Sequence, residues 1–386
     1  MSAPTPSLLT SKSIQSLLAI SLASLFLNGC QVVIDETEDD SDTSVSDLLS
    51  ITTDLGDCDL GTDAATVACA ANAWLDSLDS DQLDAAQLDW SESDARTVWS
   101  NLPISSVTRN GVRLDKMSSE AQQAAMNLAS AALSNAGYSD FIGGLAADEY
   151  LNVEQGASGY GAELYYFAVF GYPDSGNDWM LQIGGHHMAY NITYLSGEGF
   201  PVPHHKGAEP KVAFELDSST YAPLEGEADA MVAMFEGLSD DDFDTAYLSG
   251  QSFSDVVVGP DNGSGVLPDD YPSGSDRDGM LVSDLSSYQQ SLVIEAISEW
   301  VEDYPDNVAD SLMDAYTSDD AFADTYIAWA GTYSKGVDVD TAGTYMRIDG
   351  PRLWIEIVCQ NGIVLSSQTH YHAMFRDKDY DYGNSL

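Results

Sequence analysis

Basic residues are scarce in this chain. It holds 63 aspartates and glutamates against 13 lysines and arginines, which gives a formal net charge of −50. Such a surface repels DNA, RNA and anionic lipid heads, so no nucleic-acid partner is expected. Solvation in salt explains this acidity better than specific binding of cations does.

Several signatures of catalysis are missing as well. The chain contains no Gly-x-Ser-x-Gly elbow, Walker A loop, Rossmann glycine fingerprint or His-Glu-x-x-His motif. The first absence argues against a serine hydrolase of the elbow type, and the next two predict no nucleotide cofactor. Without a Cys-x-x-Cys motif, a thioredoxin-type site or a zinc ribbon has no support.

Acidic residues are absent from positions 1–29, which hold an apolar run over 17–27. This run is too short to span a bilayer but is typical of a signal-peptide core. It leads into Leu27-Asn28-Gly29-Cys30, the residue order of a bacterial lipobox. We predict that 1–29 is a lipoprotein signal peptide and that Cys30 carries the lipid that holds the protein at a membrane. The protein would then work in the cell envelope, in the periplasm or at the cell surface. An ordinary secretory signal with a chance cysteine is the alternative.

Residues 30–56 are acidic, rich in serine and threonine and free of aromatic residues. They are predicted to form a disordered tether. Residues 57–386 are expected to fold as one large domain, with the Pro-, Gly- and Asp-rich loop 259–279 as a candidate seam. Cys58 and Cys69 flank a short acidic loop, and export makes them a disulfide candidate.

Helical and strand signals both occur in the predicted domain. Ser119-x-x-Gln122 and Ser286-x-x-Gln289 each precede a long amphipathic run, which indicates two capped helices. They are either remnants of a duplicated unit or convergent uses of a good cap. Strands predicted over 344–348, 352–358 and 368–376 form a C-terminal antiparallel β-meander. The fold class is therefore α+β, with helices packed around a mostly antiparallel sheet.

The six histidines fall in three tight pairs. Alternate residues of a strand share a face, so His370 and His372 are predicted to present two imidazoles about 7 Å apart at Cβ. That spacing lets both side chains bind one ion. The alternative is a pair of ordinary polar residues on a solvated sheet face.

His186 and His187 follow two glycines, which permit a bend or a close approach of another backbone. Adjacent strand residues face opposite sides, so only one of them is expected to join His370 and His372 unless the glycines distort the strand. The other would brace the site or meet the substrate. The remaining pair, His204-His205, is predicted in a Pro-bounded loop and is a weaker candidate.

A carboxylate would complete such a site, because three nitrogens with an acid or water suit zinc, copper or iron. Glu356 is the first candidate, although a two-residue turn at Asn361-Gly362 would put it on the face away from the histidines. A loop widened by Ser366-Ser367 would change that register. Otherwise Glu356 is expected to pair with Arg347 or Arg352. Glu209 is the second candidate.

The tail holds two further candidates, Arg376 and Asp381. The Asp377–Gly383 segment looks like an EF-hand loop, but its glycine is misplaced and no twelfth-position glutamate follows. We expect this segment to be ordered and Asp381 to fold back toward the histidine strand.

Together these segments resemble the family catalogued as domain of unknown function 3500, over nearly the whole mature chain. The markers are Trp99-Ser-Asn-Leu-Pro103, Arg109-Asn-Gly-Val-Arg113, Phe170-Gly-x-Pro173, Gly184-Gly-His-His-x-x-x-Asn191, Gly207-Ala-Glu-Pro210, Trp329-x-Gly331, Tyr345-x-Arg-Ile-x-Gly-Pro351, His370-x-His372 and Arg376-Asp with Asp381-Tyr-Gly383. The resemblance implies one long exported domain but no established activity.

Three functions are compatible with these residues. The first is a metal-dependent enzyme, hydrolytic or oxidative, in which Glu356 acts as general base and Arg347 or Arg376 orients an anionic or carbonyl group. The second is a non-catalytic surface lipoprotein that binds a small-molecule or polymer ligand. The third is a structural envelope component whose histidines make internal hydrogen bonds.

Overall fold

The computed structural model describes residues 45–386 except 62, 261, 263–270, 275 and 276. The predicted signal peptide, Cys30 and most of the predicted tether lie outside the described residues, as does much of loop 259–279. Within the described part, no helix combines the length and the apolar character needed to cross a membrane.

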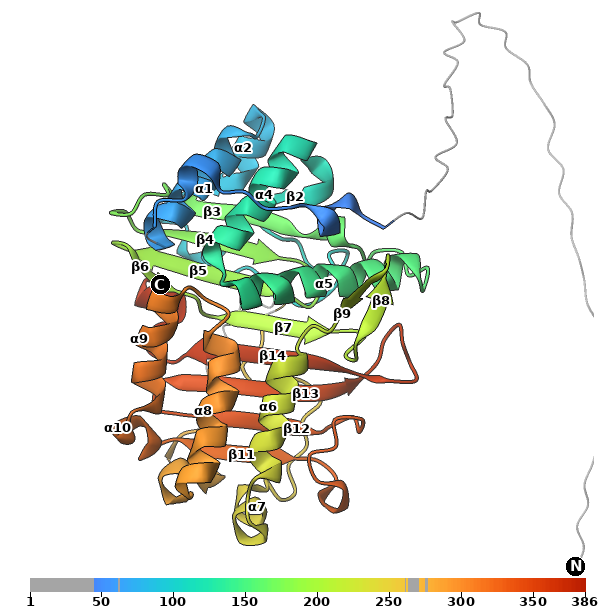
Figure 1. The fold of residues 1–386 in the computed structure, drawn as a ribbon, viewed down its shortest axis with the longest axis vertical. Coiled ribbons are helices and arrows are strands. Elements are labelled where there is room, and N and C mark those ends of the chain that lie inside the picture. Colours follow the sequence, from blue (N-terminus) through green and yellow to red (C-terminus); the bar gives the residue numbers. More distant parts are fainter. Residues whose placement is uncertain (1–44, 62, 261, 263–270, 275–276) are drawn as a thin grey trace, which may run out of the picture. The chain divides into compact units, whose positions relative to one another are not determined.

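One large sheet runs through the described domain (Figure 1). Its strands follow the order β1-β3-β4-β5-β7-β14-β13-β12-β11-β10, with β2 beside β3, β6 beside β5, and β8-β9 as a separate hairpin. All pairs of these strands are antiparallel except β1 with β3. The bounds are β1 (Gln87–Leu88), β2 (Val112–Arg113), β3 (Tyr166–Gly171), β4 (Trp179–Gly184), β5 (Ala189–Leu195), β6 (Glu198–Phe200), β7 (His204–Ala208), β8 (Phe214–Leu216), β9 (Ser219–Tyr221), β10 (Met280–Leu281), β11 (Tyr326–Ala330), β12 (Tyr345–Asp349), β13 (Leu353–Asn361) and β14 (Thr369–Asp377).

Helices lie across one face of this sheet, as α5, α6 and α8 show in Figure 1. The helices are α1 (Asp63–Asp76), α2 (Ser80–Ala86), α3 (Ser93–Arg96), α4 (Ser119–Ala132), α5 (Asn135–Val153), α6 (Glu225–Glu236), α7 (Asp240–Ala246), α8 (Ser287–Val301), α9 (Asp306–Thr317) and α10 (Asp319–Phe322). Helices with a mostly antiparallel sheet confirm the predicted α+β class.

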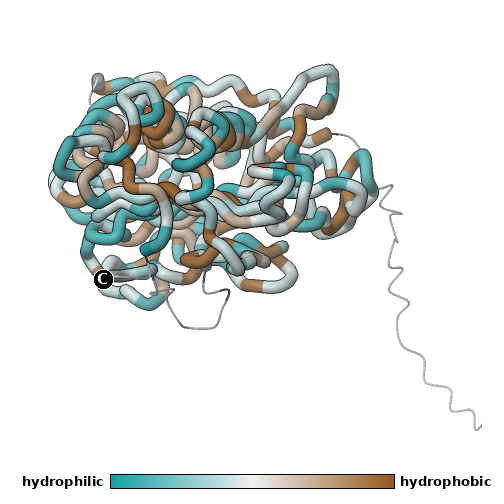
Figure 2. The backbone as a smooth tube through the Cα atoms, turned by 90° about the horizontal axis from the view of Figure 1, so that it is seen from below, coloured by the Kyte–Doolittle hydropathy of each residue, from teal (hydrophilic) through white to brown (hydrophobic). Residues whose placement is uncertain are grey.

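The two faces of the sheet are covered differently. The main apolar core, with Trp74, Phe141, Trp300 and Trp329, lies between the helices and what we call the helix face. Loop segments cover the opposite side, the loop face, where the apolar contacts form smaller clusters. Hydrophobic stretches alternate with hydrophilic ones along the backbone (Figure 2). The candidate site lies on the loop face.

The chain repeats one architectural unit. With α3, β6 and α10 set aside, the first half has the order α1, α2, β1, β2, α4, α5, β3, β4, β5 and β7. The second half has the corresponding order α6, α7, β10, α8, α9 and β11 to β14. Gln87 pairs with Val169 in parallel, and Tyr247 makes the matching parallel bridge to Trp329. The antiparallel β7–β14 pair joins the two halves.

Equivalent side chains make equivalent bonds in the two halves. Gln122 Nε2 donates to Leu114 O, and Gln290 Nε2 donates to Val282 O. Of the two explanations for the similar helix starts, duplication is the one that accounts for the matching strands. The boundary between the repeats falls between β7 and α6.

The predicted helix caps are partly correct. Ser286 and Gln289 form the expected capping box of α8. At the start of α4, however, the N-cap is Ser118, whose hydroxyl accepts from Ala121 N. The long helix predicted there is two helices, because the chain turns at Leu133 and Ser134 caps α5.

The C-terminal meander is confirmed, but its last connection is longer than a two-residue turn. Gln360 pairs with His370, and Gly362 N donates to Gln368 O, so the loop runs from Gly362 to Gln368. In this register Glu356 pairs with Met374. Glu356 therefore lies on the same face as His370 and His372, and the two-residue-turn register that would have put it on the opposite face is wrong.

Candidate metal centre

His370 and His372 lie on β14 at the middle of the sheet and point to the loop face. Tyr371 between them packs in the core on the helix face. The Nε2 atoms of His370 and His372 are 3.3 Å apart. Both side chains are buried, with exposed fractions of 1% and 6%. Burial, and then the neighbouring His372, lowers the pKa of His370 to about 4, which keeps this imidazole neutral near pH 7.

His187 joins them from the turn between β4 and β5. Its φ of 63° lies in the left-handed region, and its N–H donates to Asn101 O at 3.0 Å. Gly207, which pairs with His372, makes this approach feasible, since a Cβ there would lie 3.0 Å from the His187 ring. Each of the three histidines offers a ring nitrogen within 4.8 Å of the other two. Burial also lowers the pKa of His187 well below its usual value.

Arg109 holds the turn that carries His187. Its guanidinium donates to Gly185 O at 3.0 Å and to Ser100 O at 2.9 Å, and it also reaches Val107 O and Leu102 O. Burial lowers the pKa of Arg109 to about 10, so the group stays charged near neutrality. One cation thus ties the loop after Trp99 to the β4–β5 turn.

Three side chains surround the far nitrogen of His372. Asp255 Oδ1 lies 2.9 Å from His372 Nδ1, and the side-chain amides of Gln360 and Asn101 lie 3.1 and 3.3 Å from it. With the proton on Nδ1, Asp255 accepts it, the amide nitrogens Gln360 Nε2 and Asn101 Nδ2 make no hydrogen bond to this nitrogen, and the Nε2 lone pair of His372 is directed toward His370. A carboxylate behind a ligating histidine is a recurrent device for orienting it toward a metal.

His186 lies beside the three histidines as a brace. Its ring stacks on His187 with centroids 3.7 Å apart, and its Nδ1 lies 2.7 Å from Asp148 Oδ1. Tyr165 Oη donates to His186 O, and Tyr160 packs edge-on against the imidazole. Burial raises the pKa of Asp148, and the neighbouring His186 opposes that rise. His186 and Asp148 form a buried imidazole–carboxyl pair next to the candidate centre.

His204 and His205 lie on β7, so the predicted loop is a strand. His205 faces the loop side, 5.5 Å from His372 between ring centroids, and its Nδ1 lies 2.9 Å from His187 O. Burial, and then His372, lowers the pKa of His205 to about 3. His204 faces the helix side and contacts Tyr304 Oη at 2.8 Å. Only His205 borders the candidate centre.

A second group of side chains is close enough together to hold a cation. It consists of the carboxylates of Asp140, Glu227 and Asp303, each of which has an oxygen within 4.8 Å of the other two. The ammonium of Lys206 already contacts all three carboxylates. Lys206 is 3% exposed and belongs to β7 on its helix face. This group is a buried ion-pair cluster between the two halves.

The other predicted catalytic residues lie apart from the three histidines. Glu356 accepts from Val257 N, Val258 N and Tyr345 Oη. Arg347 donates to Asp278 O, and Arg352 pairs with Asp377, so neither forms the predicted bond to Glu356.

Arg376 pairs with Asp381 at 2.9 Å, and Trp99 lies between this pair and His205. Burial raises the pKa of Asp381 to about 6, and Arg376 opposes that rise. Asp381 does fold back onto β14, but at the arginine end of the strand. Glu209 follows β7, accepts from Val364 N and Leu365 N, and is 1% exposed.

Several residues of the site were not predicted from the sequence, among them Asp255, Asn101, Gln360 and Asp148. Asp255 lies in a Ser- and Gly-rich stretch and carries no local signal. Asn101 belongs to the Trp99–Pro103 marker, which could have pointed to it. Both reach His372 from loops far away in the chain.

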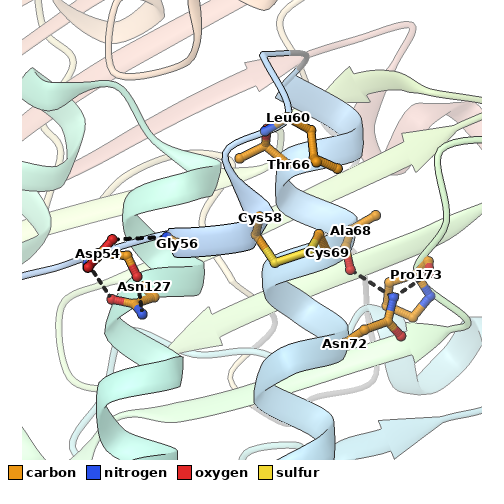
Figure 3. Close-up of a disulfide and its surroundings, with 10 residues drawn as sticks. All are labelled: Asp54, Gly56, Cys58, Leu60, Thr66, Ala68, Cys69, Asn72, Asn127 and Pro173. Carbon is orange, nitrogen blue, oxygen red and sulfur yellow. Dashed lines mark hydrogen bonds between the residues drawn. A yellow bond between two sulfur atoms is a disulfide. The ribbon is translucent and has the colours of Figure 1, made fainter.

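Of the cysteines that the structure describes, none belongs to the group formed by His187, His370 and His372. Cys58 and Cys69 are joined in a disulfide that ties the segment before α1 to this helix (Figure 3). Cys359 is a buried free thiol. Burial raises its pKa to about 12, so it is not a thiolate nucleophile at neutral pH.

The family model described as "Protein of unknown function (DUF3500)" matches residues 61–384. No curated protein and no solved structure matches the chain.

Proposed function

The chain belongs to the DUF3500 family, and on that premise we propose that it is a metal-dependent enzyme that works outside the cytoplasm, with His187, His370 and His372 as metal ligands. The observation that carries this proposal is the 3.3 Å separation of the His370 and His372 Nε2 atoms. Two nitrogens bound at about 2.05 Å to a tetrahedral zinc ion lie about 3.3 Å apart. Three buried imidazoles with a carboxylate behind one of them fit such an ion.

Zinc is the ion we favour, because three protein nitrogens with one position left for substrate or water are the usual arrangement of its catalytic sites. A divalent ion bound here would supply Lewis-acid chemistry for hydrolysis if it is zinc, or redox chemistry if it is copper or iron.

The chain's own residues supply the acid–base part. His186 Nδ1 is engaged by Asp148 at 2.7 Å, which leaves its Nε2 to accept or return a proton. The stack on His187 keeps that imidazole beside the ligands. Glu356 no longer serves as the proposed base, because its two oxygens already accept three hydrogen bonds.

Metal analysis by mass spectrometry on protein purified without chelator tests this function. The wild type should contain about one equivalent of one transition metal, and the His370→Ala/His372→Ala variant almost none. The control is His204→Gln, which alters a buried histidine on the helix face and should leave the metal bound. A wild-type content below about 0.2 equivalents would contradict the proposal and favour a ligand-binding or structural role.

We also propose that a lipid on Cys30 anchors the protein at the bacterial cell envelope. Support comes from the Leu27-Asn28-Gly29-Cys30 order and from the Cys58–Cys69 disulfide, a bond typical of oxidising compartments. Cells fed an alkyne fatty acid should label the wild type but not Cys30→Ala, and only the wild type should sediment with membranes. Equal labelling of both proteins would contradict the anchor.

A further inference from the structure

Glu356 is a buried carboxylate whose hydrogen bonds are directed at a single loop. It lies in the middle of β13 and is 0% exposed. Its Oε2 accepts from Val257 N at 2.8 Å and from Tyr345 Oη at 2.9 Å, and its Oε1 accepts from Val258 N at 2.9 Å. Two successive backbone amides therefore bind the two oxygens of one carboxylate. Such charge-assisted bonds are among the stronger contacts that a loop can make with a sheet.

The loop held in this way carries Asp255. Asp255 Oδ1 lies 2.9 Å from His372 Nδ1 and accepts from Val256 N at 2.8 Å. The Asp255 side chain is 50% exposed, so packing alone does not confine it. Its position depends on the backbone of the next residues, and Glu356 binds that backbone.

We infer that Glu356 is a positioning residue of the candidate metal centre, acting through the backbone of Val257 and Val258 on Asp255 and through Asp255 on His372. The inference rests on the proposed metal site. In this arrangement Glu356 fixes the loop, Asp255 fixes the Nδ1 side of the imidazole, and Nε2 is left directed at His370. Glu356 touches neither the metal ligands nor a substrate.

The first half of the molecule shows what the same position does without a metal ligand to support. In the second half, Ala328 of β11 pairs with Arg347 of β12, which pairs with Glu356 of β13. In the first half, Ala168 of β3 pairs with Gln182 of β4, which pairs with Asn191 of β5. Asn191 thus takes the place of Glu356, and it accepts from Gln182 Nε2 and donates to Pro203 O, so its bonds go to β4 and to the segment before β7.

When the sequence of α7 is aligned with that of α2 and the alignment is extended without a gap, Ala95 falls opposite Asp255. In the first half, therefore, the residue at the Glu356 position binds other partners than the segment that follows α2, and that segment has Ala95 at the Asp255 position. The carboxylate of Glu356, which accepts from the loop, therefore occurs in the same half as the loop that carries Asp255.

A double-mutant cycle on the dissociation constant for zinc tests the inference. The full chain, stripped of metal, is titrated with Zn²⁺ against a chromophoric chelator, using wild type, Asp255→Asn, Glu356→Gln and the double variant. Glu356→Gln keeps the side-chain shape but points an NH₂ group at one of the two loop amides.

Each single substitution should weaken zinc binding about 10- to 100-fold, the usual effect of losing support behind a ligand. The double variant should bind zinc no more weakly than Asp255→Asn alone. Gln290→Ala, which removes a hydrogen bond far from the site, is the control and should lower the melting temperature without changing zinc affinity.

Two results would overturn the inference while leaving the metal site in place. One is a Glu356→Gln variant that melts earlier but binds zinc as the wild type does. The other is a double variant whose loss of affinity is the product of the single losses. A wild type that binds no zinc would overturn the proposed metal site and this inference with it. Should Glu356→Gln fail to fold, Tyr345→Phe, which removes one hydrogen bond from the carboxylate, takes its place under the same criterion.

Discussion

The two halves of the sheet use one scaffold for different purposes. In both halves, a loop after the short α2 or α7 helix covers the loop face, and an arginine in an Arg-Asn-Gly or Arg-Asp-Gly segment binds a strand turn. Arg109 donates to Gly185 O, and Arg277 donates to Asp349 O. In the first half that turn carries His187, whereas in the second half it carries Pro351 and Arg352.

The ligands are also divided between the halves. The first half supplies His187 and the second supplies His370 and His372, so the candidate centre lies across the β7–β14 seam. Asn101 from one half and Asp255 from the other meet at His372. The two halves thus share a backbone plan, whereas each supplies different side chains to the candidate centre.

Substitution of two equivalent glycines is the most severe test of this repeat. Gly111 and Gly279 both have positive φ. A Cβ at Gly111 would lie 2.0 Å from Phe167 O, and a Cβ at Gly279 would lie 2.5 Å from Ile327 O. Gly111→Ala and Gly279→Ala should each lower the free energy of unfolding by about 4 kcal/mol, from left-handed strain and overpacking together. Denaturant titration measures this. Gly250 also has positive φ, but a Cβ there would meet no atom within 4 Å, so Gly250→Ala should lower the free energy of unfolding by only about 1 to 2 kcal/mol. A large loss at only one of the two positions would break the equivalence.

Removing the paired arginines separates stability from metal binding. Arg109→Met and Arg277→Met should each cost about 3 kcal/mol, because buried acceptors lose a charged donor. Only Arg109→Met should also lose bound metal, since Arg109 holds the turn that carries His187. Metal content is measured below the melting temperature of both variants. Equal loss of metal in the two variants would mean that Arg109 and Arg277 do not differ in their effect on the candidate metal centre.

The seam between the halves also predicts a dependence of stability on pH. Burial raises the pKa of Glu227 from 4.5 to about 8 and that of Asp303 from 3.8 to about 7, although Lys206 opposes both shifts. The folded state therefore binds more protons than the unfolded state between these values. Its free energy of unfolding should fall as the pH rises from about 4.5 to 8.

In the Glu227→Gln variant, the free energy of unfolding should fall less as the pH rises over this range, because one of the two titrating carboxyl groups has been removed. Urea unfolding at half-unit steps from pH 5 to 8.5 compares the slopes. Identical slopes in the two proteins would show that Glu227 does not titrate in this range.

The smallest expected effect concerns two glutamines. Gln122 and Gln290 each donate to the backbone of the turn before their helix. Gln122→Ala and Gln290→Ala should each lower the free energy of unfolding by about 1 kcal/mol, the usual net value of such a bond. Thermal melts of the two variants should shift together. A difference of more than twofold between the two losses would show that the halves have diverged even here.

Much of the fold and part of the site followed from the sequence alone. Alternation along β14 put His370 and His372 on one face, because side chains of a strand repeat every two residues. The strong strand patterns near the C-terminus predicted the confirmed meander, and the family markers predicted the confirmed DUF3500 match. The strand faces and the meander depend on neighbours close in the chain, whereas the family match depends on markers spread from Trp99 to Gly383.

Tertiary structure decided the rest. The loop from Gly362 to Gln368 set the β13–β14 register and so the face of Glu356, which a one-residue slip would have reversed. His187 rather than His186 reached the other histidines because of its positive φ and the empty space at Gly207. Asn101 and Asp255 came to His372 from distant loops. Local periodicity determines which face a side chain takes, but only packing between distant segments determines what it meets there.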